Sequence, residues 1–480
     1  MPATTTRVVA ATALAAGIAL QSGELLKAQS CPYSLATNSP RGSSSPVLPG
    51  PYYDYEPSVM LDGSYRMWWC STTGTGDSIL YSTASSLDGP WSSQVAVFSP
   101  TYGATFDGEQ TCDPSVMRVN GVYYMYYGGK DIGAPGATTT RIGLATSADG
   151  VNWVRANGGN PIIRPRLQPG DAGFSSLPNQ YGAGQPSVTY VNGYFYLIYT
   201  DTSGLAALVG CGGCGQYVLR STDPTFQTGV QELVGPGNFQ TKTAANHTTY
   251  SLGPWFGVDW QYVDMLDAFA IARGGATYSE HLVSFYDSTL ATTSGSVSLP
   301  VNWTEGAGIV SRPDKHAVAA PTCGTIPIDI MVSTGTPGNP WSWDLAHKGL
   351  NVATGLSCAC SRMPKVLDGY IVLSNGLPWM IPFGGVRLQF ALAAPAQQLS
   401  KNYIVVGSDV YFSVPYGASL YPNNAAYYTD GQPWAFYLDD GRLWPGSCYN
   451  LFAYNGSYAG YMPPSTYGPT PKGPALYCVQ

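Results

Sequence analysis

One hairpin pattern recurs along the chain and constrains its fold more than any other feature. In each copy an acidic or amide residue stands at the start of an apolar strand and is usually followed by a proline. A tight turn and an antiparallel, aromatic-rich strand come next. An Asn-Gly turn between apolar runs favours a hairpin because both central residues need a positive φ. The copies are residues 56–69, 112–127, 185–199 and, more loosely, 259–272. Self-similarity at this spacing indicates a repeat architecture.

A second pair of strands follows each hairpin. These pairs begin at residues 79–82, 141–146, 217–221, 282–286 and 328–334, and most of them lead to a tryptophan. The fifth unit has a degraded first hairpin, which we place around residues 316–323. Sheets of four strands repeated radially are propeller blades. We therefore predict an all-β chain that forms a five-bladed β-propeller over residues 52–350.

The pattern of the sequence changes from about Cys358. Short aromatic strands, separated by turns of the Asp-Gly kind, are expected at residues 377–381, 409–412 and 432–438. We predict a small C-terminal all-β domain over residues 357–480, stapled by Cys448 and Cys478. Two interpretations of this domain stay open: a carbohydrate-binding module that uses the tyrosines of residues 454–467, and a spacer packed on the propeller.

The N-terminus has the layout of an export signal. Arg7 precedes an apolar run at residues 8–20, and small residues follow at the end of the stretch. We predict that residues 1–30 are a secretory signal peptide, because the run is too short to span a bilayer. All ten cysteines lie at or after Cys31, which suits a disulfide-permitting compartment. The expected location is therefore secreted and extracellular, or periplasmic.

The charge balance limits the class of partner. The net charge is −7, the pI is near 5.0, and only 11% of residues are charged. This balance argues against nucleic acid and against an anionic membrane as partners. We expect the chain to be a monomer.

Two cysteine pairs can be interpreted from their positions. Cys70 ends the second strand of one unit and Cys112 opens the first strand of the next, so both are expected on the same face and we predict a disulfide between them. Cys211 and Cys214 form a Cys-x-x-Cys that suits a zinc half-site, a redox pair or a disulfide. No second Cys-x-x-Cys accompanies it, which favours the disulfide.

The strand order predicts where a binding site lies. Short turns gather on one face of the units, and the long loops at residues 100–111, 128–140, 167–184, 201–216 and 273–280 gather on the other. A rigid scaffold usually carries its site among its long loops. The first residues of the inner strands, Glu56, Asp113, Gln185 and Asp259, are expected to converge there. Such carboxylates suit sugar hydrolysis, whereas the alternative is that an Asp-Pro merely caps a turn.

The repeated acid-Pro-Ser-Val hairpins with Asn/Asp-Gly-x-Tyr-x-x-Tyr turns resemble those of the five-bladed propeller glycoside hydrolases of families 43, 32, 62, 68 and 130. The resemblance covers residues 52–350. In family 43 it implies a general base at the first inner strand, a pKa-tuning aspartate later and a glutamate general acid in the fourth blade. The matching positions hold Glu56, Gln185 and Asp259. In the fructan-cleaving relatives it implies an Asp-Pro in the second blade, as at Asp113, and a glutamate where this chain has Gln185.

Further residues on the loop face extend the candidate site. Glu280 and Glu109 are alternative general acids, and His316 is a channel histidine. Trp260 is the candidate sugar platform, beside Trp68, Trp69 and Trp255 as alternatives that core packing would also explain. We thus predict catalytic roles for Glu56, Asp113, Asp259 and Glu280 and substrate binding by Gln185, Trp260 and His316, with no metal or cofactor except a structural calcium that the resemblance allows. The predicted function is a secreted glycoside hydrolase, and the alternative is a glycan-binding, lectin-like propeller.

Overall fold

The fold was analysed in a computed structural model. It describes residues 33–38, 40–43, 45–48, 53–72, 76–132, 140–168, 170–172, 174, 181–203, 215–243, 250–318, 322–336, 339–357, 367, 371–383, 386–390, 403–420, 424–429, 432–438, 443–446, 456–461, 463, 465 and 469. Strands make up almost all of the regular structure, beside the helix α3 (Ser408–Ser413) and the 3-10 helix η1 (Asn157–Gly159). The all-β prediction is therefore confirmed. In the described chain no helix is long and apolar enough to cross a membrane, and the predicted signal peptide lies outside the described residues.

Strands β3 to β22 fall into consecutive sets whose neighbouring members pair antiparallel. The first set is β3 (Asp54–Asp62), β4 (Ser64–Thr72), β5 (Asp77–Ala84) and β6 (Val95–Phe98). The second is β7 (Gln110–Val119), β8 (Val122–Lys130), β9 (Thr140–Ser147) and β10 (Val154–Arg155). The third is β11 (Ala183–Val191), β12 (Tyr194–Asp201), β13 (Gln216–Ser221), β14 (Gln231–Gly235) and β15 (Asn238–Thr241). The fourth is β16 (Asp259–Val263), β17 (Ala268–Gly274), β18 (Glu280–Asp287) and β19 (Thr293–Pro300), and the fifth is β20 (Glu305–Ser311), β21 (Thr325–Thr336) and β22 (Asn339–Ala353).

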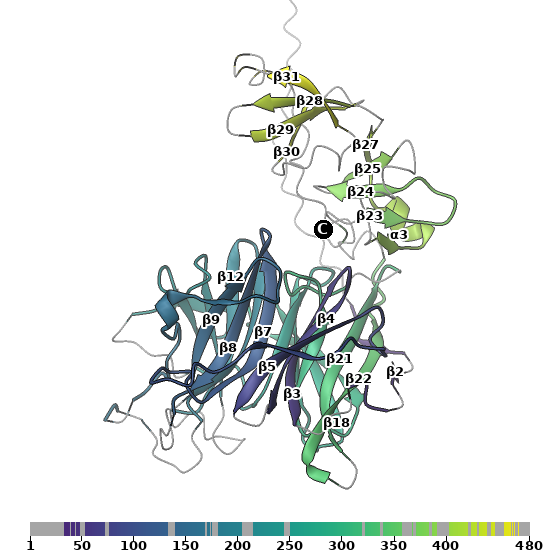
Figure 1. Cartoon of the computed structure of the whole chain (residues 1–480). Coiled ribbons are helices and arrows are strands. Elements are labelled where there is room, and N and C mark those ends of the chain that lie inside the picture. The colour runs from purple at the N-terminus through teal and green to yellow at the C-terminus, as the bar shows by residue number, and fades with distance from the viewer. Residues whose placement is uncertain are drawn as a thin grey trace, which may run out of the picture. The chain divides into compact units, whose positions relative to one another are not determined.

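The sets follow one another so that the last meets the first (Figure 1). The first strand of each set packs beside the first strand of the next, in the order β3, β7, β11, β16 and β20. Strand β20 then pairs in parallel with β3, at Val310 and Val59. Two N-terminal strands, β1 (Ala36–Thr37) and β2 (Arg41–Gly42), pair with β22. The first and last strands of the predicted propeller, residues 52–350, therefore lie in one sheet. That sheet also includes residues before position 52 and after position 350.

The serine of the recurring Pro-Ser-Val motif joins neighbouring sets. Ser58 accepts a hydrogen bond from the backbone N–H of Val116 (2.9 Å), and Ser115 does the same for Val188 (3.0 Å). Ser187 accepts from the N–H of Trp260 (3.2 Å). Each hydroxyl thus satisfies a buried backbone donor of the next inner strand, which an apolar side chain would leave unpaired at a cost of about 1–3 kcal/mol. The motif recurs because the same hydrogen bond, from a backbone N–H to a serine hydroxyl, recurs between neighbouring sets.

The predicted tight turns are confirmed at the positions of the hairpin motifs. Val119 pairs with Val122 around Asn120-Gly121, and both turn residues have positive φ (52° and 81°). Asn192-Gly193 joins β11 to β12 in the same way, with φ of 51° and 86°. The favoured two-residue turn matches the twist of the paired strands.

The fifth set differs from its prediction. Its first strand is β20, and no hairpin forms at residues 316–323 among the described positions. Residues 312–318, the crossing segment, instead run past the far ends of other inner strands. Carbonyls of this segment accept hydrogen bonds from the N–H groups of Arg118 (2.7 Å), Tyr190 (3.2 Å) and Tyr262 (3.0 Å). The unpaired strand ends of three sets are thereby satisfied by one segment.

The core lies between neighbouring sets. Trp68, Met125 and Tyr127 pack together between the first and second sets, and Ile198, Trp260 and Phe269 do so between the third and fourth. Trp69, Val310 and Met331 close the contact between the fifth and first sets. All of these side chains are at most 4% exposed, so this burial holds the ring of inner strands together.

Two further sheets follow in the C-terminal region and are described by themselves. One contains β23 (Ile371–Leu373), β24 (Met380–Phe383), β25 (Val386–Phe390), β26 (Tyr403–Val405) and β27 (Tyr416–Leu420). The other contains β28 (Asn424–Thr429), β29 (Gln432–Tyr437), β30 (Leu443–Gly446) and β31 (Gly456–Tyr461). The strand predicted at residues 409–412 is instead part of helix α3, since a short apolar run does not distinguish a strand from a buried helical turn. Cys448 and Cys478 lie outside the described residues.

Candidate active site

Three predicted site residues share one unusual backbone conformation. Glu56, Asp113 and Gln185 have φ of 44°, 52° and 48°, in the left-handed region, and each stands at a bulge of its inner strand. A bulge re-aims a side chain, and a left-handed conformation in a residue other than glycine costs of order 1–3 kcal/mol. The following proline is fixed by its ring, so the bulge is rigid. The repeated bulge therefore holds three polar side chains in place, at a cost in backbone strain.

The fourth hairpin aligns with the other three differently from the prediction, in which Asp259 matched Gln185. The N–H of Ile309 donates to Asp259 Oδ2 (2.8 Å), as the inner-strand N–H groups of other sets donate to serines. Asp259 thus takes the place of Ser187 in the repeat, and the residue at the left-handed position is Gly257, with φ of 58°. Lys315 Nζ donates to both oxygens of Asp259 (2.7 and 2.9 Å) in a buried ion pair. Asp259 does not line the pocket described below, so the structure does not bring it to the place expected for the general acid.

Glu56 reaches into space that two glycines leave open. A Cβ at Gly257 or Gly306 would lie 2.4 or 2.3 Å from Glu56 Oε1. The amide of Gln185 donates to the same oxygen (3.3 Å). Burial, followed by the charges of Asp113 and Glu305, raises the pKa of Glu56 well above its ordinary value. Glu56 is therefore a buried carboxyl group whose neutral form is favoured by its surroundings.

Asp113 is held as the more acidic member of the site. Tyr181 Oη donates to Asp113 Oδ2 (2.5 Å), and the backbone N–H of Gln185 also donates to this carboxylate. Burial raises the pKa of Asp113 to about 6, while the two hydrogen bonds limit the rise. The carboxylate is thus ionised at pH 7. Tyr181 lies in the predicted loop of residues 167–184 but was not itself predicted.

Glu305 is the site residue that the sequence analysis missed. It is the first residue of β20, beside the bulge between Glu305 and Ala307. Burial, then the charges of Asp113 and Asp77, raise the pKa of Glu305 to about 8. The carboxyl is therefore protonated at pH 7. A signal was present: Trp303 closes the fourth unit, so the next apolar stretch should begin the fifth inner strand.

Asp113 and Glu305 line one pocket of about 180 Å³. Gln185 and Tyr181 also line it, as do Tyr53 and Tyr55 from the start of the first set. The backbone at Gly128 lies close to Asp113, because a Cβ there would be 3.0 Å from Asp113 Oδ2. Two carboxyl groups of one pocket thus differ in protonation at neutral pH, which is the arrangement that acid–base chemistry needs.

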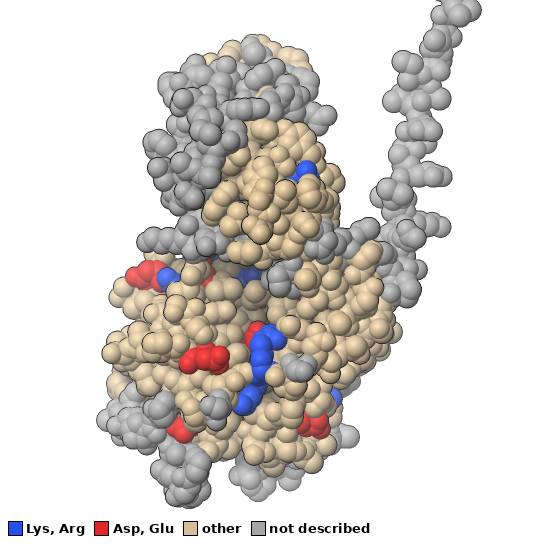
Figure 2. Space-filling view, turned by 90° about the vertical axis from the view of Figure 1, so that its right-hand side faces the viewer, with Lys and Arg blue, Asp and Glu red and all other residues tan. Residues whose placement is uncertain are grey.

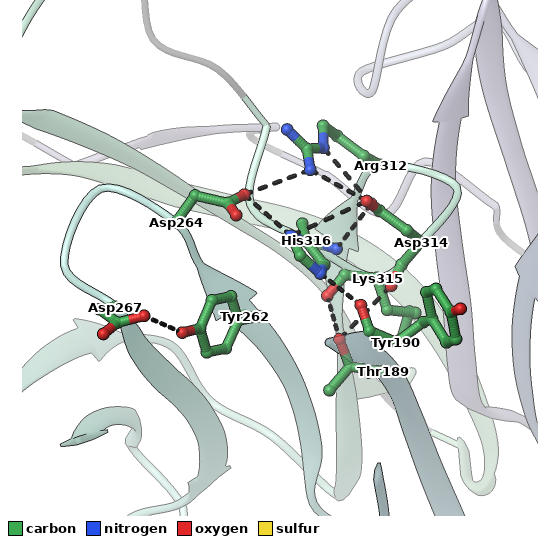
Figure 3. Close-up of polar contacts among 9 residues, drawn as sticks. All are labelled: Thr189, Tyr190, Tyr262, Asp264, Asp267, Arg312, Asp314, Lys315 and His316. Atoms are coloured by element: carbon green, nitrogen blue, oxygen red, sulfur yellow. Dashed lines mark hydrogen bonds and ion pairs between the residues drawn. The ribbon is translucent and has the colours of Figure 1, made fainter. Parts of the chain in front are cut away.

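His316 lies away from this pocket, in the crossing segment (Figure 3). Its Nδ1 donates to Asp264 (2.8 Å) and its Nε2 donates to the carbonyl of Tyr190 (2.6 Å). Arg312 donates to Asp264 (3.2 Å) and to Asp314 (3.0 Å). Both ring nitrogens therefore face acceptors. Burial alone would lower the pKa of His316, but Asp314 and Asp264 raise it. The structure gives this histidine a place in a buried ion-pair network rather than beside a substrate.

The remaining predicted site residues named below contact other parts of the fold and do not line the pocket. Trp260 is fully buried and stacks on Phe269 (centroids 4.8 Å apart), so it offers no face to a sugar. Glu280 accepts a hydrogen bond from Ser298 (2.6 Å) in the fourth set and does not line the pocket. Glu109 forms an ion pair with Lys130 (2.8 Å). Trp68 and Trp69 are core residues.

The predicted disulfide between Cys70 and Cys112 is confirmed, with the two Cα atoms 4.9 Å apart. It lies in the wall of the pocket, next to Asp113. The described residues contain one cluster with potential metal-ligand spacing: Cys70, Asp77 and Cys112. Two of its three members are bonded to each other, and a disulfide sulfur is not the thiolate that metals bind. Cys211 and Cys214 lie outside the described residues.

Comparisons with known proteins agree with the class that the hairpins suggest. No family model matches the chain. It is 30% identical over 137 residues to the arabinan endo-1,5-α-L-arabinosidase A of Aspergillus niger, a match that covers 28% of this chain and 37% of the relative. It is 37% identical over 87 residues to a probable arabinan endo-1,5-α-L-arabinosidase A of Emericella nidulans, covering 18% and 24%. The chain thus spans less than two fifths of the length of each of these relatives. The matches confirm the resemblance to glycoside hydrolases.

Solved structures show a weaker likeness. A family 117 glycoside hydrolase of Zobellia galactanivorans gives a TM-score of 0.44 at 12% identity, over 66% of this chain and 90% of that one. The α-L-arabinofuranosidase of Podospora anserina in complex with cellotriose gives 0.39 at 13% identity, over 67% and 97%. We draw no conclusion from likeness at these scores.

Proposed function

We propose that this protein is a secreted glycoside hydrolase built on a five-bladed β-propeller. The five strand sets, the contacts between their first strands and the pairing of β20 with β3 support the propeller. The Cys70–Cys112 disulfide supports a compartment outside the cytosol. The observation that carries the proposed activity is the pair of carboxyl groups in one pocket, Asp113 ionised and Glu305 protonated at pH 7.

The two carboxyl groups divide the reaction between them. Glu305 gives its proton to the glycosidic oxygen that leaves, so no alkoxide has to form. Asp113 acts on the anomeric carbon, either by taking a proton from the attacking water or by attacking as a nucleophile that water later displaces. Tyr181 and the backbone N–H of Gln185 hold Asp113 in place for either route. Glu56 contacts the side-chain amide of Gln185 (3.3 Å), and the charges of Asp113 and Glu305 act on its pKa.

We infer that the substrate is a neutral polysaccharide of the arabinan type. The curated relatives are named for arabinan and for its α-1,5-linked L-arabinose residues. The pocket of about 180 Å³ is below the roughly 300–1,000 Å³ of sites for drug-sized ligands, which suits a single sugar residue. Only 11% of the residues are charged, and most of the described surface drawn in Figure 2 is uncharged, which favours an uncharged partner.

A lectin-like propeller is the second candidate. Gln185 favours it, because an amide stands where the fructan-cleaving relatives have an acid. A pure binding site gains nothing from two carboxyl groups whose pKa values differ, and burying them costs stability. The pKa difference therefore favours catalysis.

Hydrolysis of an arabinan panel by the purified protein tests the proposal. We expect Asp113→Asn to lower kcat by at least about 10²-fold, because the amide can be neither base nor nucleophile. Glu305→Gln should lower kcat strongly on arabinan and weakly on activated aryl arabinosides, whose leaving group needs little protonation. Glu280→Gln is the matched control and should retain activity. Glycan binding without turnover by the wild-type protein would favour the lectin-like alternative.

A further inference from the structure

The residue just before each left-handed bulge is the last one that pairs regularly with the neighbouring strand. Tyr55 is the last residue of β3 that pairs with β4 ahead of Glu56. Cys112 is the last residue of β7 that pairs with β8 ahead of Asp113. Contacts that fix Tyr55 and Cys112 therefore also fix where the two bulges begin.

A disulfide links these two positions across neighbouring sets. Cys70 is the β4 partner of Tyr55, and its disulfide to Cys112 runs from the first set to the second. Both cysteines are buried, and they pack with the Tyr55 ring in one small cluster. The starts of the two bulges are therefore held in place relative to each other by a covalent bond.

The hydroxyl of Tyr55 adds a polar contact at the same place. It donates to Asp77 Oδ2 (3.0 Å) and lies 3.0 Å from Cys112 Sγ. Thr72 donates to the other oxygen, Asp77 Oδ1 (2.8 Å). Because both of its oxygens accept hydrogen bonds, the carboxyl group of Asp77 has a fixed orientation, and it holds the Tyr55 ring against the disulfide.

The third copy of the motif uses this position differently. Gly184 precedes the bulge at Gln185 and has no side chain, and a Cβ there would lie 2.3 Å from Tyr181 Oη. The space is occupied instead by the tyrosine that donates to Asp113 (2.5 Å). Asp113 is thus held at its carboxyl group by Tyr181 and at its backbone through Cys112.

We propose that Tyr55, Cys70, Asp77 and Cys112 form a clasp that positions the bulge of Asp113 for the reaction. These four are positioning residues, because they act through Asp113. A carboxylate that attacks or activates water must meet the anomeric carbon in one geometry, so a small displacement is costly in rate. This inference rests on the proposed function for the reaction, but the clasp itself is defined by its own contacts.

Tyr55→Phe tests the clasp with the least change, because it keeps the ring and removes only the hydroxyl. We expect kcat to fall by about tenfold on both arabinan and an aryl arabinoside, since Asp113 acts at the anomeric carbon whatever group leaves. KM should change by less than about twofold, because the pocket keeps its shape.

Tyr126→Phe is the matched control. It removes the hydroxyl of another buried tyrosine, which donates to the carbonyl of Pro224 (2.8 Å) and does not line the pocket. We expect this variant to keep the wild-type kcat. Equal kcat in Tyr55→Phe and Tyr126→Phe, or a rise in KM alone for Tyr55→Phe, would overturn the inference and leave the proposed function intact.

The pH profile separates positioning from a loss of folded protein. Hydrogen bonds from Tyr181 and from the backbone N–H of Gln185 lower the pKa of Asp113, so an Asp113 that is no longer aligned with them titrates at a higher pH. In Tyr55→Phe the acidic limb of kcat/KM should therefore move up from about pH 6, and the alkaline limb should stay. An acidic limb at its wild-type position would count against the clasp. The other ionisable groups that line the pocket or act on Asp113 are unchanged in this variant: Tyr53, Glu56, Asp77, Lys130, Tyr181 and Glu305.

Hydrogen exchange tests the clasp without any turnover. In Tyr55→Phe, and more so in the double variant Cys70→Ala with Cys112→Ala, the amides of residues 110–115 should exchange at least about tenfold faster than in the wild type. Those of β16, at residues 259–263, should keep their rates. If the wild-type protein hydrolyses none of the arabinans, the proposed function fails, and this measurement still decides whether the clasp orders the bulge. Wild-type exchange at residues 110–115 in Tyr55→Phe would refute the clasp.

Discussion

At the scale of single residues, the site is built from groups that the backbone forces into costly states. Asp113 carries a left-handed φ and a raised pKa, and Glu305 is kept protonated by burial and by neighbouring acids. Both states cost stability, and costs of this kind cluster at functional sites, which supports the proposed role of the two residues. Two predictions belong to this scale.

The pH dependence of kcat/KM should be bell-shaped. Asp113 must be ionised, so the rate rises as pH passes about 6; Glu305 must be protonated, so the rate falls as pH passes about 8. We expect the maximum near pH 7 on arabinan. Glu305→Gln should remove the alkaline limb of the profile measured on an aryl arabinoside. An alkaline limb that persists in this variant would show that another group donates the proton.

Gly306→Ala should damage activity more than stability. The new Cβ would meet Glu56 Oε1 at 2.3 Å, and the side chain of Glu56 can yield only by moving within the site. We expect kcat/KM to fall at least about tenfold, a transition-state cost of roughly 1.4 kcal/mol. The matched control is Gly121→Ala, where φ is 81° and nothing lies within 4 Å of the new Cβ. It should cost about 1–2 kcal/mol of stability and no activity. The opposite pattern would contradict a role for the space beside Glu56.

At the scale of elements, one segment contacts the inner strands of several sets. The crossing segment accepts backbone hydrogen bonds from three sets and sends Lys315 to Asp259. It also joins the buried Arg312 and His316 with the partly exposed Asp314 in a single network (Figure 3). His316, which the sequence analysis offered as a site candidate, instead helps to hold the far ends of the inner strands together.

Lys315→Met should be strongly destabilising. It leaves Asp259 buried without its cation, and breaking a buried pair from one side costs about 3–5 kcal/mol. We expect this loss in the free energy of unfolding measured with urea. The double variant Lys315→Met with Asp259→Asn should recover much of the loss, because no unpaired charge remains. A double variant that is less stable than the single one would mean that Asp259 acts mainly through Ser187 and Ile309.

At the scale of the whole molecule, the chain closes its ring with residues from both ends of the predicted domain. Arg41 donates to Asp329 (2.6 Å) from the N-terminal strand β2. His347 on β22 donates to Asp329 (2.9 Å) and to Asp88 (2.8 Å) of the first set. This cluster joins the first and fifth sets, so its protonation should govern how firmly they meet.

Stability should therefore depend on pH through His347. Burial alone would lower the pKa of His347, but its hydrogen bonds to Asp329 and Asp88 raise it above 6.5. A raised folded-state pKa gives stability that is fully present below about pH 6.5 and is lost as pH rises through the folded value. We expect the urea midpoint of the wild-type protein to fall over this range, and to fall less for His347→Gln. Identical pH slopes for the two proteins would refute this role.

The sequence by itself determined the parts that rest on local chemistry. Asn120-Gly121 specifies a turn because of φ, the apolar and aromatic-rich runs on either side of it specify strands, and the positions of Cys70 and Cys112 in adjacent units specified their disulfide. Glu56, Asp113 and Gln185 share one backbone conformation because they share one repeated motif, so the sequence could propose these three candidate residues together.

Only the tertiary structure decided which acids share a pocket. Asp259 and Glu305 look alike in the sequence as acids heading inner strands, but the repeat register is set by hydrogen bonds between sets, and it places Asp259 on Lys315 and Glu305 beside Asp113. Trp260 and His316 are indistinguishable in the sequence from exposed ligands, because burial depends on what packs against them. The protonation of a carboxyl group likewise depends on desolvation and on charges from distant strands. These are properties of the closed ring and not of any segment within it.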